Sequence, residues 1–179
     1  MPLIDEKKFL EIYDENVGKI YRYIYFRLDS EELAQDLTSE VFLKSWQYFS
    51  NPASGSKKIF FRQRHWENPR AFIYQVARNL IVDFYRQKDK NPLSLEEIKS
   101  SGEMVDKKGN PEEKISKELE KDSIKKALLA LNPDYQEIII WRYLDEMEIK
   151  EIAEILNKSE GATRTLLSRA LGRLKEILN

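Results

Sequence analysis

The stretch from 156 to 178, LNKSEGATRTLLSRALGRLKEIL, carries residue types that suit contact with nucleic acid. Its apolar residues recur at helical spacing and predict one buried face. The opposite face is short, hydroxylated and basic, and it holds two glycines although glycine inside a helix costs about 1 kcal/mol against alanine. Short side chains permit close approach to a sugar-phosphate backbone, and arginines donate to phosphates and base edges. The residues we expect to contact DNA are Ser159, Arg164, Thr165, Ser168, Arg169 and Arg173.

A second, shorter helix is predicted immediately before this one. Its apolar residues are Ile149, Ile152, Ala153 and Leu156, and Ser159 is placed to cap the helix that follows. Two short helices joined by a tight turn, with the second one basic on its outer face, are typical of a helix-turn-helix that lays its second helix in the major groove. Periodicity alone would fit a plain helical hairpin equally well.

The formal net charge of -1 conceals a strong segregation of charge along the chain. Residues 56–90 carry nine bases against three acids, and residues 158–179 carry five against two. In contrast, residues 1–50 carry six bases against ten acids, and residues 127–157 carry two against seven. Two basic zones in an acidic background suit an anionic partner that is touched at two places. Solvated helix faces would explain the number of charges but not their clustering.

The elements that position these residues are predicted to be helices throughout. Six glycines in 179 residues and long runs of Leu, Ile, Lys and Glu favour an all-α chain. A first helix is predicted on Leu10, Tyr13, Val17, Ile20, Tyr21 and Ile24, and Asp29 with Glu32 predicts a capping-box start for a second. A third carries Ile73, Val76, Ala77, Leu80 and Phe84. Phe72 and Tyr74 are expected in the core with them.

Breaks in this pattern divide the chain into two small helical domains. Residues 91–110 are polar and interrupted by Pro and Gly, which predicts a flexible linker. The domains are then 1–90 and 111–179, the second of which contains the helix-turn-helix. Within it, helix starts are predicted at Asn110, at Asn132 before Pro133, and near Glu148.

Composition argues against several other classes of protein. No apolar window of about 18 residues and no signal peptide occur, so a cytoplasmic protein without membrane insertion is expected. The chain has no cysteine and a single histidine, His65, with no carboxylate at a fixed spacing from it. It lacks phosphate-loop and dinucleotide-binding glycine patterns. We therefore expect no enzymatic activity, no metal site and no cofactor.

Two blocks of the sequence together resemble one protein family. DLTSEVF at 36–42, followed by Trp46 and by NPRAFIYQVARNLIVDFYR at 68–86, is similar to conserved region two of bacterial RNA polymerase sigma factors of the extracytoplasmic-function class. LNPDYQEIIIWRYLDEMEIKEIAEILNKSEGATRTLLSRALGRLKEIL at 131–178 resembles their region four. The blocks occur in the right order and cover nearly the whole chain except the linker.

This resemblance implies a sigma factor that binds core RNA polymerase and promoter DNA. In the relatives, the helix with the DLTxEVF motif docks on the largest polymerase subunit, which points here to Asp36, Leu37, Ser39, Glu40 and Phe42. In the relatives, the following basic loop and helix recognise and melt the minus-ten element. Melting requires a site for the unstacked bases, and each base that stacks on an aromatic side chain in a basic groove is stabilised by about 1 to 3 kcal/mol. The residues available for that are Phe60, Phe61, Arg62, Arg64, Trp66, Arg70, Arg78, Asn79 and Arg86. Region four would read the minus-thirty-five element.

The resemblance leaves some features open. Glu146 stands where relatives commonly have glycine, and Glu148 where a Ser or Thr cap is usual, so a looser turn is expected there. The 51–67 loop is longer than usual. An anti-sigma factor is a further partner that the family admits. The alternative is a helix-turn-helix regulator that binds an operator without polymerase, but such proteins usually dimerise, and the absence of a heptad seam favours a monomer.

Overall fold

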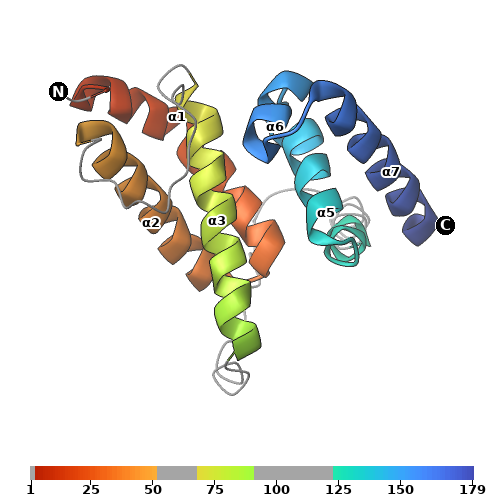
Figure 1. The fold of residues 1–179 in the computed structure, drawn as a ribbon. Helices are drawn as coiled ribbons and strands as arrows, with labels where there is room; N and C mark the ends of the chain where they lie inside the picture. Colours follow the sequence, from red (N-terminus) through yellow and green to blue (C-terminus); the bar gives the residue numbers. More distant parts are fainter. Residues whose placement is uncertain (1–2, 52–67, 91–122) are drawn as a thin grey trace, which may run out of the picture.

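The computed structural model of this chain describes residues 3–51, 68–90 and 123–179. Every regular element in these ranges is a helix, which confirms the all-α prediction (Figure 1). No helix among them is both long and apolar enough to cross a membrane. The proposed linker 91–110, the helix start at Asn110 and the loop residues 52–67 lie outside the described residues.

The N-terminal unit consists of three helices that pack on one another, α1 (Glu6–Leu28), α2 (Glu31–Ser50) and α3 (Pro69–Lys90). The predicted capping box at Asp29 is wrong by one residue. Asp29 instead ends α1 in the left-handed conformation with φ 53°, and its N–H donates to Tyr25 O over 2.8 Å. Ser30 caps α2, because its Oγ accepts from Leu33 N at 3.3 Å.

The buried face of α1 also differs from the prediction. Leu10 and Tyr13, expected inside, are 52% and 38% exposed. The side that faces the core includes two polar residues, Asn16 and Arg27. Asn16 is tolerated there because its Nδ2 donates to Ile12 O at 2.8 Å. The residues buried along α1 are Phe9, Ile12, Asn16, Ile20, Tyr23, Ile24 and Arg27.

The C-terminal unit begins with helical residues 123–129 and continues through α5 (Pro133–Ile139), the π-helical turn η4 (Ile140–Leu144), α6 (Ile149–Leu156) and α7 (Glu160–Leu178). The predicted starts at Asn132 and Glu148 are confirmed as caps. Asn132 Oδ1 accepts from Tyr135 N at 2.9 Å, and Pro133 occupies the first turn. α7 packs on both α5 and α6.

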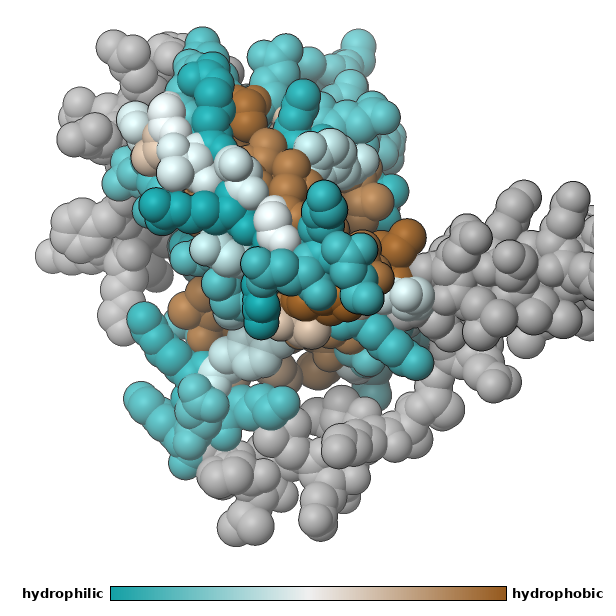
Figure 2. Space-filling model, turned by 90° about the vertical axis from the view of Figure 1, so that its right-hand side faces the viewer, coloured by the Kyte–Doolittle hydropathy of each residue, from teal (hydrophilic) through white to brown (hydrophobic). Residues whose placement is uncertain are grey.

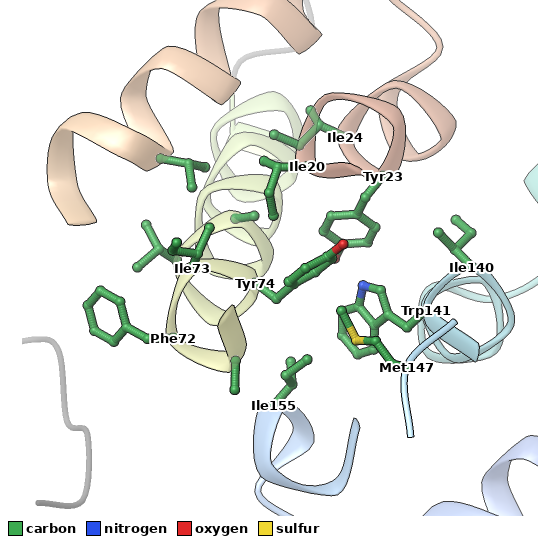
Figure 3. Packing of buried hydrophobic residues seen from close by; sticks show 14 of the residues in the cluster. Ile20, Tyr23, Ile24, Phe72, Ile73, Tyr74, Ile140, Trp141, Met147 and Ile155 are labelled. Atoms are coloured by element: carbon green, nitrogen blue, oxygen red, sulfur yellow. The ribbon is translucent and has the colours of Figure 1, made fainter. Parts of the chain in front are cut away.

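The two units pack directly against each other, which the sequence did not predict. α3 contacts α6 and α1 contacts α5, and one hydrophobic cluster runs through both units. At their junction Tyr23 of α1, Tyr74 of α3 and Trp141 of η4 point toward one another (Figure 3). Their ring centroids lie 5.4 to 6.1 Å apart, and all three side chains are fully buried. Such aromatic contacts stabilise an interface by more than the burial of their apolar area alone would.

Candidate nucleic-acid interface

α6 and α7 form the predicted helix-turn-helix. α6 ends at Leu156 and is capped by Asn157, whose φ of 52° turns the chain, and Lys158 N donates to Ala153 O at 2.9 Å. Ser159 begins α7 as predicted, since its Oγ accepts from Ala162 N at 3.2 Å. Thr163 is fully buried and donates to Ser159 O at 2.9 Å, which fixes the first turn of α7. The turn therefore sets the direction of α7 with backbone and side-chain contacts.

The turn before α6 holds the two residues that depart from the family pattern, Glu146 and Glu148. Glu146 has φ 53°, a left-handed conformation that glycine adopts freely and other residues rarely do. Backbone contacts nevertheless hold the turn, because Met147 N donates to Trp141 O at 2.9 Å and Glu148 N donates to Glu151 Oε2 at 3.1 Å. The expected looseness is not seen in these hydrogen bonds.

The polar face of α7 is open to solvent. Arg164 lies 2.8 Å from Glu160 and Arg173 lies 2.7 Å from Glu176, both in exposed pairs within the helix. Arg169 forms no ion pair with any described residue. Exposed pairs contribute little energy, so these guanidinium groups can exchange their partners for phosphates at small cost. All six residues predicted to contact DNA here are exposed, namely Ser159, Arg164, Thr165, Ser168, Arg169 and Arg173.

The shape of this face also permits close approach. A Cβ added at Gly161 or at Gly172 would meet nothing within 4 Å, so neither glycine is required by packing inside the molecule. Figure 2 looks onto the side where α7 lies and shows mostly hydrophilic surface, interrupted by a hydrophobic band. Leu171 and Leu178 of α7 are 36% and 49% exposed.

The second predicted DNA-contacting surface lies on α3, and part of it contacts the C-terminal unit instead of solvent. Arg70, Tyr74 and Arg78 are spaced four residues apart and point to the C-terminal unit. Arg70 Nη2 donates to Asp145 O at 2.7 Å, and Tyr74 Oη donates to Asp145 Oδ2 at 2.8 Å. Arg78 Nε donates to Glu137 Oε2 at 2.8 Å. The structure therefore places Arg70 and Arg78, two of the three predicted arginines of α3, in the contact between the units.

Two more contacts involve the same arginines. Arg70 Nη1 lies 3.5 Å from Glu151 Oε1, and Arg78 Nη2 lies 3.2 Å from Asp134 Oδ1. Both carboxylates belong to the acidic segment 127–157. The sequence showed that this segment is acidic, but it did not show which basic residues the segment contacts. The acidic zone of one unit thus neutralises part of the basic zone of the other.

Sequence reasoning missed the residues of α1 that take part. Arg22 Nη2 donates to Leu144 O and to Asp145 Oδ1, each at 2.6 Å. Arg27 forms a buried ion pair with Glu137, and Tyr23 Oη donates to Glu137 Oε1 at 3.2 Å. The opposite net charges of segments 56–90 and 127–157 were a signal that α3 contacts the C-terminal unit. They gave no such signal for α1, because α1 lies in segment 1–50, which is acidic overall.

Burial changes the ionisation of the groups in this contact. It raises the pKa of Tyr74 and of Tyr23, and the carboxylates of Asp145 and Glu137 next to them act in the same direction. Burial also raises the pKa of Asp145, and this outweighs the opposite effect of Arg22, Tyr74 and Arg70. Both tyrosines therefore stay neutral and serve as hydrogen-bond donors.

The remaining residues of the predicted minus-ten surface fall into two groups. Asn79 and Arg86 on α3 are exposed, and Arg86 lies 3.8 Å from Asp83 in an exposed pair. The others lie outside the described residues, namely Phe60, Phe61, Arg62, Arg64 and Trp66, with His65 among them.

The residues predicted to bind polymerase lie along α2. Asp36 and Ser39 are exposed, Leu37 is half-buried, and Glu40 forms a surface pair with Lys44 at 3.2 Å. Phe42 faces the other way and is 5% exposed, with its ring centroid 4.7 Å from that of Tyr13. A direct contact of Phe42 with another protein is therefore not available in this conformation, and its packing instead positions α2.

Comparison with family models matches both units. Residues 12–91 match the model of Sigma-70 region 2, and residues 121–174 match that of Sigma-70, region 4. These ranges correspond to the two blocks that the sequence resemblance identified.

Two sigma factors are similar to this chain over nearly all of its length. The chain is 31% identical over 173 residues to the ECF RNA polymerase sigma factor BldN of Streptomyces coelicolor, which covers 95% of this chain and 60% of that protein. The chain thus spans only about 60% of the length of that relative. It is 26% identical over 180 residues to the ECF RNA polymerase sigma factor SigW of Bacillus subtilis, covering 97% of this chain and 90% of the relative.

Solved structures with the same fold are more distant in sequence. The sigma factor RpoE of Bartonella quintana, solved in complex with the anti-sigma factor NepR, has a TM-score of 0.67 at 20% identity and covers 96% of this chain and 97% of that one. CnrH, solved in complex with the cytosolic domain of CnrY, has a TM-score of 0.65 at 16% identity and covers 97% and 89%. At these identities the likeness concerns the fold.

Proposed function

This chain belongs to the sigma-70 family, in its ECF class, and we propose that it binds core RNA polymerase and directs transcription from specific promoters. The observation that carries the proposal is the exposed polar face of α7, in the same chain as a region-two unit. An operator-binding regulator needs only the first of these features.

In this proposal α7 lies in the major groove of the minus-thirty-five element. Arg164, Arg169 and Arg173 are the donors, and the open space at Gly161 and Gly172 lets the backbone of the helix approach the DNA. The helix-turn-helix residues Ser159, Thr165 and Ser168 complete the contact with short hydroxyl donors.

The N-terminal unit would carry the other two contacts. The exposed side of α2 with Asp36, Ser39 and Glu40 would face the polymerase, and α3 with Arg70, Arg78, Asn79 and Arg86 would contribute to the minus-ten contact. Arg70 and Arg78 are paired inside the molecule, so this second role requires the units to separate. The division into 1–90 and 111–179 agrees with the ranges of the family models and remains part of the proposal.

Further parts of the proposal follow from the family. The protein would act in the cytoplasm, where the polymerase is, as a monomer without cofactor and without enzymatic activity of its own. The Bartonella quintana relative binds an anti-sigma factor, which supports an anti-sigma partner for this chain as well.

Transcription with purified core polymerase on a library of genomic fragments tests the function. The expected result is promoter-specific transcripts that need both the chain and core polymerase. An operator-binding regulator would instead bind its site tightly without polymerase and would yield no transcript.

A further inference from the structure

An acidic residue stands at the start of α7, the helix that we assign to the major groove. Residues 158–179 carry five bases and only two acids, Glu160 and Glu176, which lie near opposite ends of α7. Glu160 is the first residue of α7, directly after the cap Ser159, and it is exposed. In a helix-turn-helix, the residues that contact base edges come from the beginning of the second helix. Glu160 therefore stands where bases are read, although phosphates repel a carboxylate.

The surroundings of Glu160 allow its side chain to reach a base. Its neighbours in this turn, Ser159, Gly161 and Ala162, are all small and exposed. A Cβ added at Gly161 would meet nothing within 4 Å. Figure 1 shows α7 along the side of the C-terminal unit that lies away from α1, α2 and α3. The backbone of this turn can thus approach the groove closely, which brings the carboxylate to the base edges.

The partner of Glu160 inside the molecule is one that DNA can take away. Arg164 Nη2 lies 2.8 Å from Glu160 Oε2, and the two side chains are 62% and 47% exposed. Such an exposed pair contributes little energy, so Arg164 can turn to a phosphate when α7 enters the groove. Glu160 then loses its donor. An ionised carboxylate only accepts hydrogen bonds, so it needs a new donor from the DNA.

We propose that Glu160 determines specificity by accepting a hydrogen bond from the amino group of a cytosine in the minus-thirty-five element. This inference rests on the proposed function, because that function places α7 in the major groove. The donors in that groove are the N4 amino group of cytosine and the N6 amino group of adenine. Adenine also presents its N7 acceptor beside the amino group, and this acceptor repels the second carboxylate oxygen. Cytosine presents no such acceptor, so Glu160 selects cytosine.

Two substitutions separate base reading from a purely structural role of Glu160. An acid in the first turn also stabilises a helix through the helix dipole, but that effect is the same for every DNA sequence. Glu160→Gln places a donor beside the acceptor, which is the arrangement that pairs with adenine N6 and N7. The preference should therefore move from cytosine to adenine. Glu160→Ala removes both groups and should leave the position without a preference.

Glu176→Ala is the matched control. Glu176 is the other acid of this segment and is exposed. It pairs with Arg173 at 2.7 Å, much as Glu160 pairs with Arg164. Glu176→Ala and Glu160→Ala each remove one negative charge and free one arginine, so the general electrostatic gain in DNA affinity is similar for both. A difference in base preference between them comes from the position of Glu160.

Selection of DNA by the polymerase holoenzyme measures the preference. The probe is duplex DNA of a promoter that the wild-type holoenzyme transcribes, with about ten base pairs of its upstream element, one turn of DNA, randomised. Sequencing of the bound fraction gives the relative affinity for each base at each position. All variants are compared at the same salt concentration.

The wild type should prefer cytosine at one position about ten-fold over the other bases. At that position Glu160→Gln should prefer adenine, and Glu160→Ala should discriminate by less than about two-fold. Glu176→Ala should keep the wild-type profile. The proposal would be overturned by equal profiles of Glu160→Ala and Glu176→Ala, or by a wild-type profile in which no position prefers cytosine.

Arg164→Ala decides whether the contact with cytosine is direct. In this variant the carboxylate of Glu160 has lost its partner from the start, so the preference for cytosine should be kept even if overall affinity falls. Loss of the preference in Arg164→Ala would mean that Glu160 acts by positioning the arginine, which would overturn the direct contact.

Failure of the proposed function would look different. The wild-type chain would then give no promoter-specific transcripts with core polymerase, and the holoenzyme would select no sequence. Promoter-specific transcription together with an unchanged profile in Glu160→Ala would keep the function and remove the assignment of Glu160 alone.

Discussion

Two surfaces of this molecule carry arginines, the polar face of α7 and the side of α3 with Arg70 and Arg78. The arginines of these two surfaces differ in how accessible they are to a partner. On α7 the arginines are exposed, and those that are paired have a carboxylate of their own helix as partner. On α3, Arg70 and Arg78 reach carboxylates of the other unit, and one of these carboxylates, that of Glu137, is 2% exposed. An arginine's availability is therefore decided by the burial of its partner, which residue type and local spacing do not reveal.

The largest effect is expected from a variant that leaves both surfaces untouched. Charge reversal at Asp36 and Glu40, as Asp36→Lys with Glu40→Lys, should abolish binding to core polymerase and transcription, because it inverts the charge on the exposed side of α2. DNA binding by α7 should persist. Co-purification with core polymerase and transcription in vitro measure this, and the double variant Asp14→Lys with Glu15→Lys, exposed on α1, is the control. Normal core binding by the Asp36 and Glu40 variant would contradict the assignment of α2.

A second prediction compares a buried with an exposed arginine directly. Arg27→Met should lower the free energy of unfolding by about 3 kcal/mol, since it breaks a buried pair and leaves Glu137 with less compensation. Arg86→Met should change it by less than about 0.5 kcal/mol, because that side chain is exposed. Urea denaturation of both variants gives the numbers. Equal costs would mean that the buried pair of Arg27 with Glu137 adds nothing to stability.

A third prediction concerns the open surface of α7. Arg169→Ala should cost about 1 to 3 kcal/mol of promoter affinity if the side chain reads a base edge. Arg164→Ala should cost less, because binding DNA takes Arg164 away from Glu160. Anisotropy titrations of polymerase holoenzyme with promoter DNA at several salt concentrations separate base contacts from phosphate contacts. Unchanged binding in both variants would remove the assignment of the recognition helix.

The smallest effect is a pH dependence at Asp145. Burial raises the pKa of this carboxyl in the closed structure, so its contribution to stability is fully present below the ordinary carboxyl pKa of 3.8 and is lost as the pH rises through the raised value. Asp145→Asn should lack this part of the slope. Urea midpoints of wild type and variant between about pH 4 and 7 compare the two. Parallel curves would show that Asp145 does not titrate in that window.

The sequence predicted the elements of the C-terminal unit well. Asn132 with Pro133, Glu148 and Ser159 are local signals, and each begins a helix in the structure as expected. Local hydrogen bonds determine such starts, so a few neighbouring residues suffice to find them.

The face of α1 was not predictable in the same way. Two stripes of α1 fit helical spacing, and the correct one contains Asn16 and Arg27, which periodicity counts as polar. Arg27 is buried only because Glu137 meets it from more than 100 residues away. Likewise, charge segregation was visible, but the sequence did not show that the acidic and basic zones meet each other.

The burial of the pair between Arg27 and Glu137 also bears on the order of events in time. Glu137 is 2% exposed and also holds Arg78 Nε at 2.8 Å through its other oxygen, so a phosphate cannot replace it at Arg78 while the units are closed. Separation must come first and binding second, which is conformational selection. The observed association rate with single-stranded DNA should then stop rising at high DNA concentration and level off at the rate of opening. That plateau belongs to the protein alone and should be the same for every DNA sequence.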